Sequence, residues 1–447
     1  MLLHLRILVH SASMSQFSRE SILLTLVPAA RPCSRHFGRG FDVPIRTLLL
    51  CGVIFPLFCG FAAPPSAPPE PPEIAHARSE INRLEQALPK ITDRGAALFL
   101  LAKEYVELGE MPKAFSLLKE CISLDEGFDP ADSQILKPLQ SFPEFAELVE
   151  EVHRRHAAVS RAHVAFTVPE KDLFPEGLAV DSDKHVFYMG SMHRKKIVKI
   201  DKRGQVSDFV KPDLYHLLGL VGIKVEPSDH GLWAASDNDR ESELLHFDDH
   251  GKLLERFSPP GAGPHVLNDL VLRGPQDIYV TDTLADVVYR FDRRTHIFAA
   301  LGLPRPLFGP NGIALSGDER LLYIADLLGV IQVELTTNAA VEVNPGPHST
   351  LAGNDGMYWY KGSLLGIQYG TGSFRVVRWQ LTPDGRRVTS TEILEYRSSL
   401  LSYPTTGAVD RDKLYFILNT GIDNYQDGNI VDPSKLEPVH IAVVPLN

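Results

Sequence analysis

The sequence predicts an all-β six-bladed β-propeller with a small N-terminal α-helical domain. From Phe166 onward, six stretches share one pattern: a short apolar strand, a turn, and a second strand rich in β-branched or aromatic residues. Asn268 and Asn311 are 43 residues apart, and Asn311 and Asp355 are 44 apart, a period typical of propeller blades. The propeller is therefore predicted over residues 166–447. The six stretches are FPEGLAVDSDKHVFYMGS, LVGIKVEPSDHGLWAASD, LNDLVLRGPQDIYVTDT, PNGIALSGDERLLYIAD, NDGMYWYKGSLLGIQYG and TTGAVDRDKLYFILNT.

Residues 76–163 follow a helical period instead, which predicts a separate helical domain. Gly109 divides the segment AALFLLAKEYVELGEMPKAFSLLKECISL into two helices, as in a helical hairpin. A generic hairpin packed on the propeller is the alternative to a repeat domain, because one helical repeat cannot bury its apolar face alone. The residues that resemble a tetratricopeptide repeat are Ala102, Tyr105, Gly109, Ala114, Leu118 and Cys121.

The N-terminal region, residues 1–63, resembles a leader. Arg46 precedes the apolar run TLLLCGVIFPLFCGFAA, which ends in small residues, as in a secretory signal peptide. We therefore expect export to the periplasm or the extracellular space, and an uncleaved membrane anchor is the alternative. Residues 64–75 are rich in proline and are predicted to form an extended linker. Three of the four cysteines lie in the leader, so the mature chain, with Cys121 alone, cannot form an internal disulfide.

The charge balance argues against nucleic acid as a partner. The chain carries 56 acidic and 45 basic residues, a formal net charge of −11 at pH 7. A nucleic-acid surface needs a basic face to contact phosphates.

Four polar residues occupy the openings of the predicted blades: Glu176, Asn268, Asn311 and Asp355. Equivalent positions on the innermost strands of a propeller face one end of the central channel, so these side chains should converge. Their hard oxygen atoms suit Ca²⁺, or Mg²⁺ or Mn²⁺ in a tighter arrangement, whereas Zn²⁺ is disfavoured. Asn-Gly and Asp-Gly are also common turn dipeptides. Recurrence at one blade position favours a metal, because a buried carboxylate without a cation is costly.

Four segments carry a resemblance to the senescence marker protein/gluconolactonase (regucalcin-like) family, and more distantly to the paraoxonases. They are FPEGLAV, NDLVL, FGPNGIALSGDERLLYIAD and NDGMYW, within a resemblance that spans about residues 174–444. The resemblance implies a divalent cation, often calcium, on the propeller axis, and hydrolysis of lactones or related esters. It also implies that Glu176, Asn311 and Asp355 are metal ligands, and that Asn268 lies near metal and substrate.

The sequence departs from the paraoxonases at their catalytic histidine. Val221 stands at the corresponding position, which argues against a histidine mechanism of that type. His265, three residues before Asn268, could approach the same end of the channel. A solvent-facing histidine in a Gly-Pro-His loop is the interpretation that we favour for it.

Lactone hydrolysis needs a polarised carbonyl, a deprotonated water and a stabilised oxyanion. A cation held by the four residues would serve the first and third needs as a Lewis acid. The resemblance favours Asp355 as the base, with Asp269 in reserve and Asn268 beside the substrate. The sequence contains no G-x-S-x-G nucleophile motif.

Two functions remain open. The first is an exported metal-dependent hydrolase of lactones or esters. The second is a non-catalytic propeller with a structural metal, whose helical domain docks a protein partner.

Overall fold

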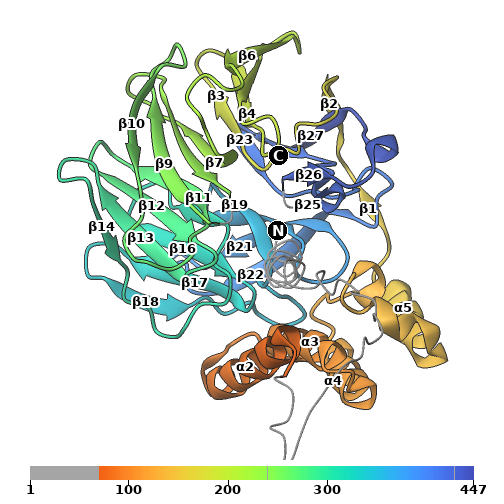
Figure 1. Ribbon diagram of the computed structural model, residues 1–447. Coiled ribbons are helices and arrows are strands. Elements are labelled where there is room, and N and C mark those ends of the chain that lie inside the picture. Colours follow the sequence, from red (N-terminus) through yellow and green to blue (C-terminus); the bar gives the residue numbers. More distant parts are fainter. Residues whose placement is uncertain (1–69, 239, 427) are drawn as a thin grey trace, which may run out of the picture.

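The computed structural model describes residues 70–238, 240–426 and 428–447, and the predicted leader and most of the linker lie outside them. Six antiparallel sheets are arranged around a central axis, which confirms the predicted six-bladed propeller (Figure 1). Each predicted strand opening contributes the innermost strand of one blade.

The first three blades follow one another along the chain, each with the innermost strand first. Blade 1 consists of β3 (Leu178–Asp181), β4 (Val186–Gly190), β5 (Ile197–Ile200) and β6 (Val206–Val210). Blade 2 consists of β7 (Gly219–Val225), β8 (Leu232–Asp237), β9 (Ser242–Phe247) and β10 (Leu253–Phe257). Blade 3 consists of β11 (Leu267–Arg273), β12 (Asp277–Asp282), β13 (Val287–Asp292) and β14 (Ile297–Ala300).

Blades 4 and 5 continue the same order. Blade 4 consists of β15 (Ile313–Leu315), β16 (Leu321–Asp326), β17 (Gly329–Glu334) and β18 (Ala339–Glu342). Blade 5 consists of β19 (Asn354–Tyr360), β20 (Ser363–Gln368), β21 (Arg375–Leu381) and β22 (Val388–Tyr396). A short strand from earlier in the chain, β1 (Val159–Ser160), adds to the outer edge of blade 5 at Tyr396.

Blade 6 closes the ring with strands from both parts of the chain. Its inner strands are β23 (Gly407–Asp410), β24 (Lys413–Ile417) and β27 (Val439–Pro445), and its outermost strand is β2 (His163–Val168). Val168 pairs with Val439, so the strand that precedes blade 1 completes the last blade. The insert between β24 and β27 holds η4 (Ile422–Asn424), β25 (Tyr425–Gln426), β26 (Asn429–Ile430) and η5 (Pro433–Lys435).

Glycines near the starts of the inner strands allow neighbouring blades to approach closely. A Cβ atom added at Gly177 would lie 1.9 Å from the carbonyl oxygen of Val221 on the next blade. At Gly222 it would lie 2.2 Å from the oxygen of Asn268, and at Gly312 2.7 Å from that of Asp355. The repeated glycine therefore fixes one ring of equivalent backbone positions around the axis.

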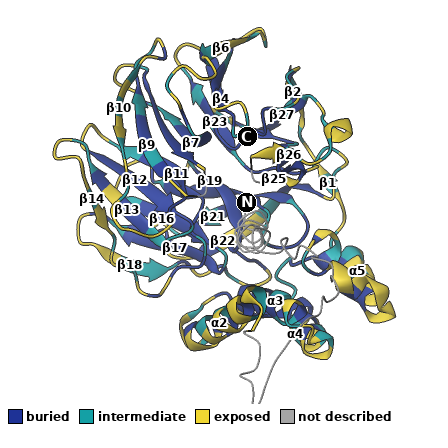
Figure 2. Ribbon diagram, viewed as in Figure 1, coloured by how far each residue is buried: buried dark blue, intermediate teal, exposed yellow. Residues whose placement is uncertain are grey.

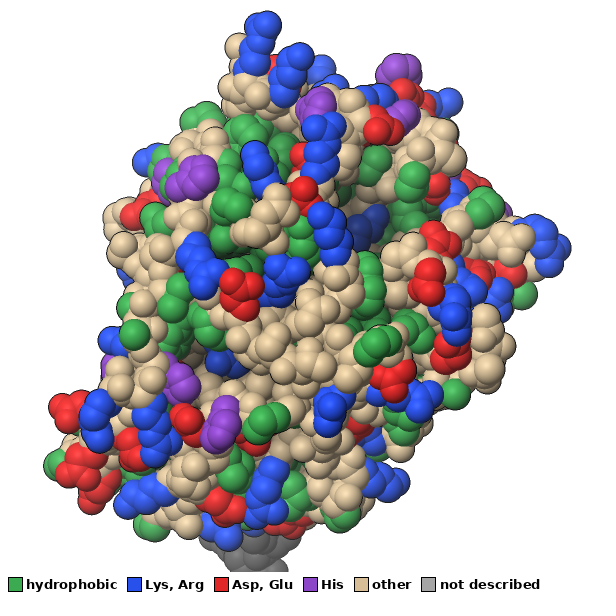
Figure 3. Space-filling model, turned by 180° about the vertical axis from the view of Figure 1, so that it is seen from behind, with side chains coloured by type: hydrophobic (Ala, Val, Ile, Leu, Met, Phe, Trp, Pro, Cys, Tyr) green, Lys and Arg blue, Asp and Glu red, His purple; other side chains and the backbone are tan. Residues whose placement is uncertain are grey.

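The strands around the axis are buried, whereas the outer strands β10 and β14 expose much of their surface (Figure 2). Apolar side chains from adjacent blades form shared clusters, such as Tyr188 and Leu220 of blades 1 and 2. On the face opposite to that of Figure 1, acidic and basic side chains intermix with apolar patches (Figure 3).

The helical unit comprises α2 (Pro72–Ala87), η1 (Leu88–Lys90), α3 (Arg94–Glu107), α4 (Met111–Ser123), η2 (Pro130–Asp132), η3 (Lys137–Ser141) and α5 (Pro143–Arg155). Helices α3 and α4 pack as a hairpin, with Gly109 at φ 75° in the turn. Phe308, Leu328 and Ala352 of the propeller join the apolar core of this unit. A helical hairpin is therefore present, and its likeness to a tetratricopeptide repeat stays a prediction.

The boundaries of the helical unit differ from the predicted range of 76–163. Helix α2 begins at Pro72, inside the predicted linker, because a proline fits the first turn of a helix, where its missing N–H is not needed. Residues 156–163 are not helical, since they lead into β1 and β2 at the edges of two blades.

Among the described residues, Cys121 is a buried free thiol. None of the described helices combines the length and the apolar character that crossing a membrane requires.

Candidate metal centre on the propeller axis

The four predicted ligands occupy equivalent openings of blades 1, 3, 4 and 5. Glu176 and Asn311 each stand two residues before an inner strand, and Asn268 and Asp355 are the second residues of β11 and β19. All four side chains are buried. Val221 occupies the equivalent position of blade 2, where it packs in an apolar cluster.

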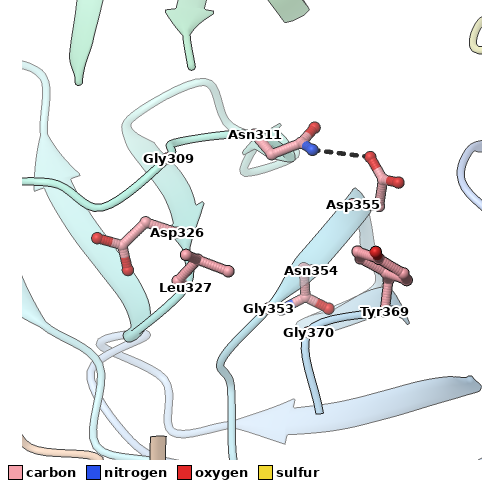
Figure 4. Close-up of a pocket in the computed structure, with 9 residues that line it drawn as sticks. All are labelled: Gly309, Asn311, Asp326, Leu327, Gly353, Asn354, Asp355, Tyr369 and Gly370. Atoms are coloured by element: carbon pink, nitrogen blue, oxygen red, sulfur yellow. Dashed lines mark hydrogen bonds between the residues drawn. The ribbon is translucent and has the colours of Figure 1, made fainter. Parts of the chain in front are cut away.

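Asn311 and Asp355 are in direct contact. Asn311 Nδ2 donates a hydrogen bond of 2.8 Å to Asp355 Oδ1. Figure 4 shows the two side chains pointing toward each other from blades 4 and 5, whereas the carboxylate of Asp326 points away from them. The pocket beside the pair is lined by Gly309, Asn311, Asp326, Leu327, Gly353, Asn354, Asp355, Tyr369 and Gly370.

Glu176 and Asp355 carry buried oxygen atoms that lack hydrogen-bond donors. Glu176 Oε1 and Asp355 Oδ2 accept no hydrogen bond from any residue that the structure describes. Burial, together with the negative charges of Asp355 and Asp237, raises the pKa of Glu176 to about 8. Burial also raises the pKa of Asp355 to about 6, with a contribution from Asp269, while the hydrogen bond from Asn311 opposes the rise. The two carboxyl groups are therefore destabilised as anions in the absence of a cation.

Asn268 is held by its own blade and linked to the next one. Its Nδ2 donates to Thr283 Oγ1 at 2.8 Å, and Thr283 Oγ1 donates to the carbonyl oxygen of Pro310 at 2.7 Å. Pro310 immediately precedes Asn311. The openings of blades 3 and 4 are thus tied together beside the predicted ligands.

Asp269, the predicted reserve base, already has a cationic partner. Its Oδ1 accepts hydrogen bonds from Lys224 Nζ at 2.7 Å and from the peptide N–H of Leu270 at 2.8 Å. Lys224 Nζ also lies 5.9 Å from the ring centre of Tyr358 on blade 5. Asp269 Oδ1 is therefore occupied by two donors, whereas Asp269 Oδ2, like Asp355 Oδ2, has no hydrogen-bond donor among the described residues.

Two tyrosines adjoin the acidic pair, and the sequence analysis did not identify them. Tyr369 lines the pocket with Asp355, and its ring centre lies 5.2 Å from that of Tyr403. Burial raises the pKa of Tyr403 well above its usual value, and a hydrogen bond with Tyr369 and the charges of Glu176 and Asp355 add to the rise. Both tyrosines lie outside the inner strands, so the blade repeat could not reveal them. The position of Tyr403, just before the TTG opening of blade 6, was the one available signal.

His265 is buried, so our preferred interpretation of a solvent-facing loop histidine was wrong. Its Nδ1 lies 2.6 Å from Asp282 Oδ2, and Asp282 is fully buried. Asp282 ends β12, as Asp326 ends β16, and Arg305 pairs with Asp326 in a similar way. In each blade the aspartate holds the preceding segment by an ion pair or hydrogen bond, which explains why the Gly-Pro-His loop folds inward. The contact between His265 and Asp282 therefore indicates that His265 holds the loop before β11 in place.

A second group of potential cation ligands lies at the far end of β3. Asp181, Asp183 and His230 each offer one ligand atom, and these atoms lie within 4.8 Å of one another. Asp181 Oδ1 accepts hydrogen bonds from the peptide N–H groups of Asp183 and Lys184, and Asp181 Oδ2 lies 2.9 Å from His230 Nδ1. These contacts account for the cluster as part of a turn, although a divalent cation could also use its oxygen atoms.

No protein-family model matches the chain, and no curated protein matches its sequence. Solved structures that are similar to it include a gluconolactonase from Xanthomonas campestris, at 14% identity over 65% of this chain and 98% of that chain, with a TM-score of 0.45. A PQQ-bound aldose sugar dehydrogenase from Streptomyces coelicolor matches at 16% identity over 64% and 99%, with a TM-score of 0.45. A luciferin-regenerating enzyme matches at 16% identity over 62% and 94%, with a TM-score of 0.44. The names of these propellers state different activities, so the function of this chain has to be argued from its own site.

Proposed function

We propose that the protein is a metal-dependent hydrolase of lactones or related esters, with the cation held at the mouth of the propeller by Glu176, Asn268, Asn311 and Asp355. The observation that carries the proposal is the pair of buried carboxyl oxygens, Glu176 Oε1 and Asp355 Oδ2, that lack a donor among the described residues. Structural carboxylates are normally paired when buried. A divalent cation is the partner that would satisfy both.

The donor set fits a hard cation, and we propose Ca²⁺ ahead of Mg²⁺ and Mn²⁺. Carboxylate and amide oxygens from four blades suit an ion that takes six to eight oxygen ligands, with positions left for water and substrate. When bound, such a cation supplies Lewis acidity toward a carbonyl oxygen and its developing negative charge.

The protein's own residues would bind, orient and move a proton. Asp355 would accept a proton from an attacking water, which is supported by the hydrogen bond from Asn311 to its Oδ1 and by the lack of a donor to its Oδ2 among the described residues. Asp269, fixed by Lys224, contributes negative charge nearby and is the second candidate for this role. Tyr369 stands beside Asp355 in the pocket, where it would contact the substrate.

Metal binding is the first test. The melting temperature of the purified protein should rise with Ca²⁺, Mg²⁺ or Mn²⁺, because a ligand that binds the folded state stabilises it. Calorimetric titration in buffers of different ionisation enthalpy should show proton release, since burial raises the pKa of Glu176 to about 8. Absence of binding by any of the three ions would refute the site.

Hydrolysis is the second test. A panel of sugar lactones, aliphatic lactones and aryl esters should include a substrate that the cation-loaded protein hydrolyses. Cation binding without turnover of any of them would favour the alternative, a non-catalytic propeller with a structural metal and a helical unit that docks a protein.

Export is a separate proposal, which rests on the leader sequence alone. Protein purified from its host should begin near residues 62–64, as determined by intact mass. A mature protein that retains its apolar leader in the membrane fraction would indicate an anchor instead.

A further inference from the structure

We infer that the helical unit is part of the metal centre: Arg83 and Asp93 are positioning residues that hold the segments leading to Asn311 and Asp355. The inference rests on the proposed function, since it concerns the same site. It assigns a role to a domain for which the propeller resemblance offers none.

The helical unit contacts the end of the propeller at which Asn311 and Asp355 lie. The turn after β16 and the segment before β19 both reach this end, and Leu328 and Ala352 from them pack in the helical core. Lys103 of α3 donates to the carbonyl oxygen of Gly370, a residue that lines the pocket, at 3.2 Å. Figure 1 shows the helices against blades 4 and 5.

Asp93 joins the helical unit to the segment that leads to Asp355. Its Oδ1 caps α3 by accepting the N–H of Ala96 at 3.0 Å. Its Oδ2 accepts the hydroxyl of Thr350 and, at 3.2 Å, the N–H of Leu351. One buried carboxylate therefore both starts a helix and fixes a loop of the propeller.

Hydrogen bonds also hold the rest of the segment between Thr350 and Asp355. Asn354 Nδ2 donates to the carbonyl oxygen of Leu351 at 2.8 Å, and Gln368 Nε2 donates to that of Ala352 at 2.7 Å. Arg375, which is buried, donates to Gln368 Oε1 and to the carbonyl oxygen of Gly127 in the helical unit. Thr350 and Leu351 are thus bound directly to Asp93, and Asn354 is bound to Leu351. Ala352 is connected to the helical unit through Gln368 and Arg375.

Arg83 performs the corresponding task for Asn311. Its Nη2 donates to Asp286 Oδ2 at 2.6 Å and to the carbonyl oxygen of Leu307 at 3.0 Å. Its guanidinium carbon lies 4.5 Å from the ring centre of Phe308. Asp286 Oδ1 in turn accepts the N–H of Gly309 at 2.8 Å, two residues before Asn311.

The two anchored segments meet at the site itself. The hydrogen bond from Asn311 Nδ2 to Asp355 Oδ1 joins their ends, so a shift of either segment would change the separation of the oxygens that face the cation. Groups that orient metal ligands typically change metal affinity by about 10- to 100-fold when they are removed. The helical unit should therefore influence cation affinity without contacting the cation.

The experiment uses the full chain and Ca²⁺ alone. Thr350→Val removes the hydroxyl that binds Asp93 but keeps the shape of the side chain, and Arg83→Met removes the guanidinium from a position that is about a third exposed. Arg94→Met is the matched control, because Arg94 lies on the same unit and pairs with Glu120 in an exposed ion pair. Affinities are measured well below the melting temperature of each variant.

We expect Thr350→Val and Arg83→Met each to bind Ca²⁺ about tenfold more weakly than the wild type, and Arg94→Met to match the wild type. Tb³⁺ bound in place of Ca²⁺ should show a shorter luminescence lifetime in the two variants, because displaced ligands admit water to the ion. A lower melting temperature with unchanged affinity and lifetime would mean that the contacts only stabilise the fold, and would overturn the inference alone. A wild type that binds no Ca²⁺, Mg²⁺ or Mn²⁺ would overturn the proposed function and this inference with it.

Discussion

The two sides of the candidate metal centre are built in different ways. Glu176 on blade 1 and Asn268 on blade 3 are placed by contacts within the propeller, such as Gly177 against Val221 and Asn268 with Thr283. Asn311 and Asp355 on blades 4 and 5 follow segments that are also anchored by the helical unit. Repetition of a blade places four polar side chains at equivalent strand openings, whereas we infer that the fine placement of two of them draws on a domain outside the repeat.

The largest expected effect comes from Asp355, on the anchored side. Asp355→Ala removes a ligand and the acceptor of Asn311, so the stabilisation by Ca²⁺ should vanish. For the wild type, that stabilisation is about 2.7 kcal/mol when Ca²⁺ is at a hundredfold excess over Kd. Thermal unfolding with and without Ca²⁺ measures it, together with hydrolysis of any substrate found. Asp318→Asn, in the exposed turn between β15 and β16 of the neighbouring blade 4, is the control that should behave as the wild type. Retained Ca²⁺ stabilisation in Asp355→Ala would remove Asp355 from the ligand set and leave it as a base.

Glu176 lies on the side of the site that only the propeller holds in place. It should dominate the pH dependence of the free energy of unfolding. Its pKa is about 8 in the folded protein and 4.5 as the ordinary value, so the folded metal-free state binds an extra proton between these limits. Metal-free stability should therefore fall as the pH rises from about 4.5 to 8, and the affinity for Ca²⁺ should rise over the same range. Glu176→Gln should flatten the part of the stability profile that lies above about pH 7, where Asp355, with a pKa of about 6, is largely ionised. Urea unfolding at a series of pH values, compared between the variant and the wild type, measures this difference. Equal slopes would show that Glu176 is not the buried proton acceptor.

A smaller effect, on the free energy of unfolding, is expected for the ion pair between Lys224 and Asp269. Lys224→Met leaves the carboxylate of Asp269 without its counterion, at side-chain exposures of 22% and 9% for the two residues. We expect a loss of about 2 kcal/mol, below the range for fully buried pairs because Lys224 is partly exposed. Urea denaturation provides the measurement. The double variant Lys224→Met/Asp269→Asn should recover part of the loss, and failure to recover any of it would argue that Lys224 acts through packing.

The smallest effect is expected for His265. His265→Gln removes one hydrogen bond to Asp282, which still accepts the N–H groups of Val266 and Ala285. A loss of about 1 kcal/mol in unfolding free energy, with unchanged Ca²⁺ affinity, would fit a structural role. A tenfold fall in hydrolysis at unchanged stability would instead place His265 in the chemistry.

The propeller and the positions of its ring could be predicted because both depend on local sequence. Each inner strand can be recognised as a short apolar run that is followed by a turn and a second strand. The glycine after Glu176 or Asn311 is required because the backbone of the next blade lies too close for a Cβ atom. These features recur at a fixed period, so weak signals reinforce one another.

The remaining parts of the site depend on contacts between residues far apart in the chain. Nothing in the sequence near Asp93 shows that its carboxylate binds Thr350. Helix α3 is apolar on most of its sides, so its sequence does not show which side contacts the propeller. His265 was misread for the same reason, because its partner Asp282 lies on another strand. Tyr369 was missed because the turns between β20 and β21 follow no repeat.

The closure of blade 6 has a consequence for synthesis on the ribosome. Strand β2 emerges early, but its partner β27 lies within the last residues of the chain, more than half the sequence away. Until those residues are made, the ring stays open, and the edge of β2 has no partner from its own blade. The helical unit likewise emerges before blades 4 and 5, against which its apolar surface packs. Native contacts of such long separation form slowly, so the edge of β2 and the apolar surface of the helical unit should stay exposed on the nascent chain until their partners have been synthesised.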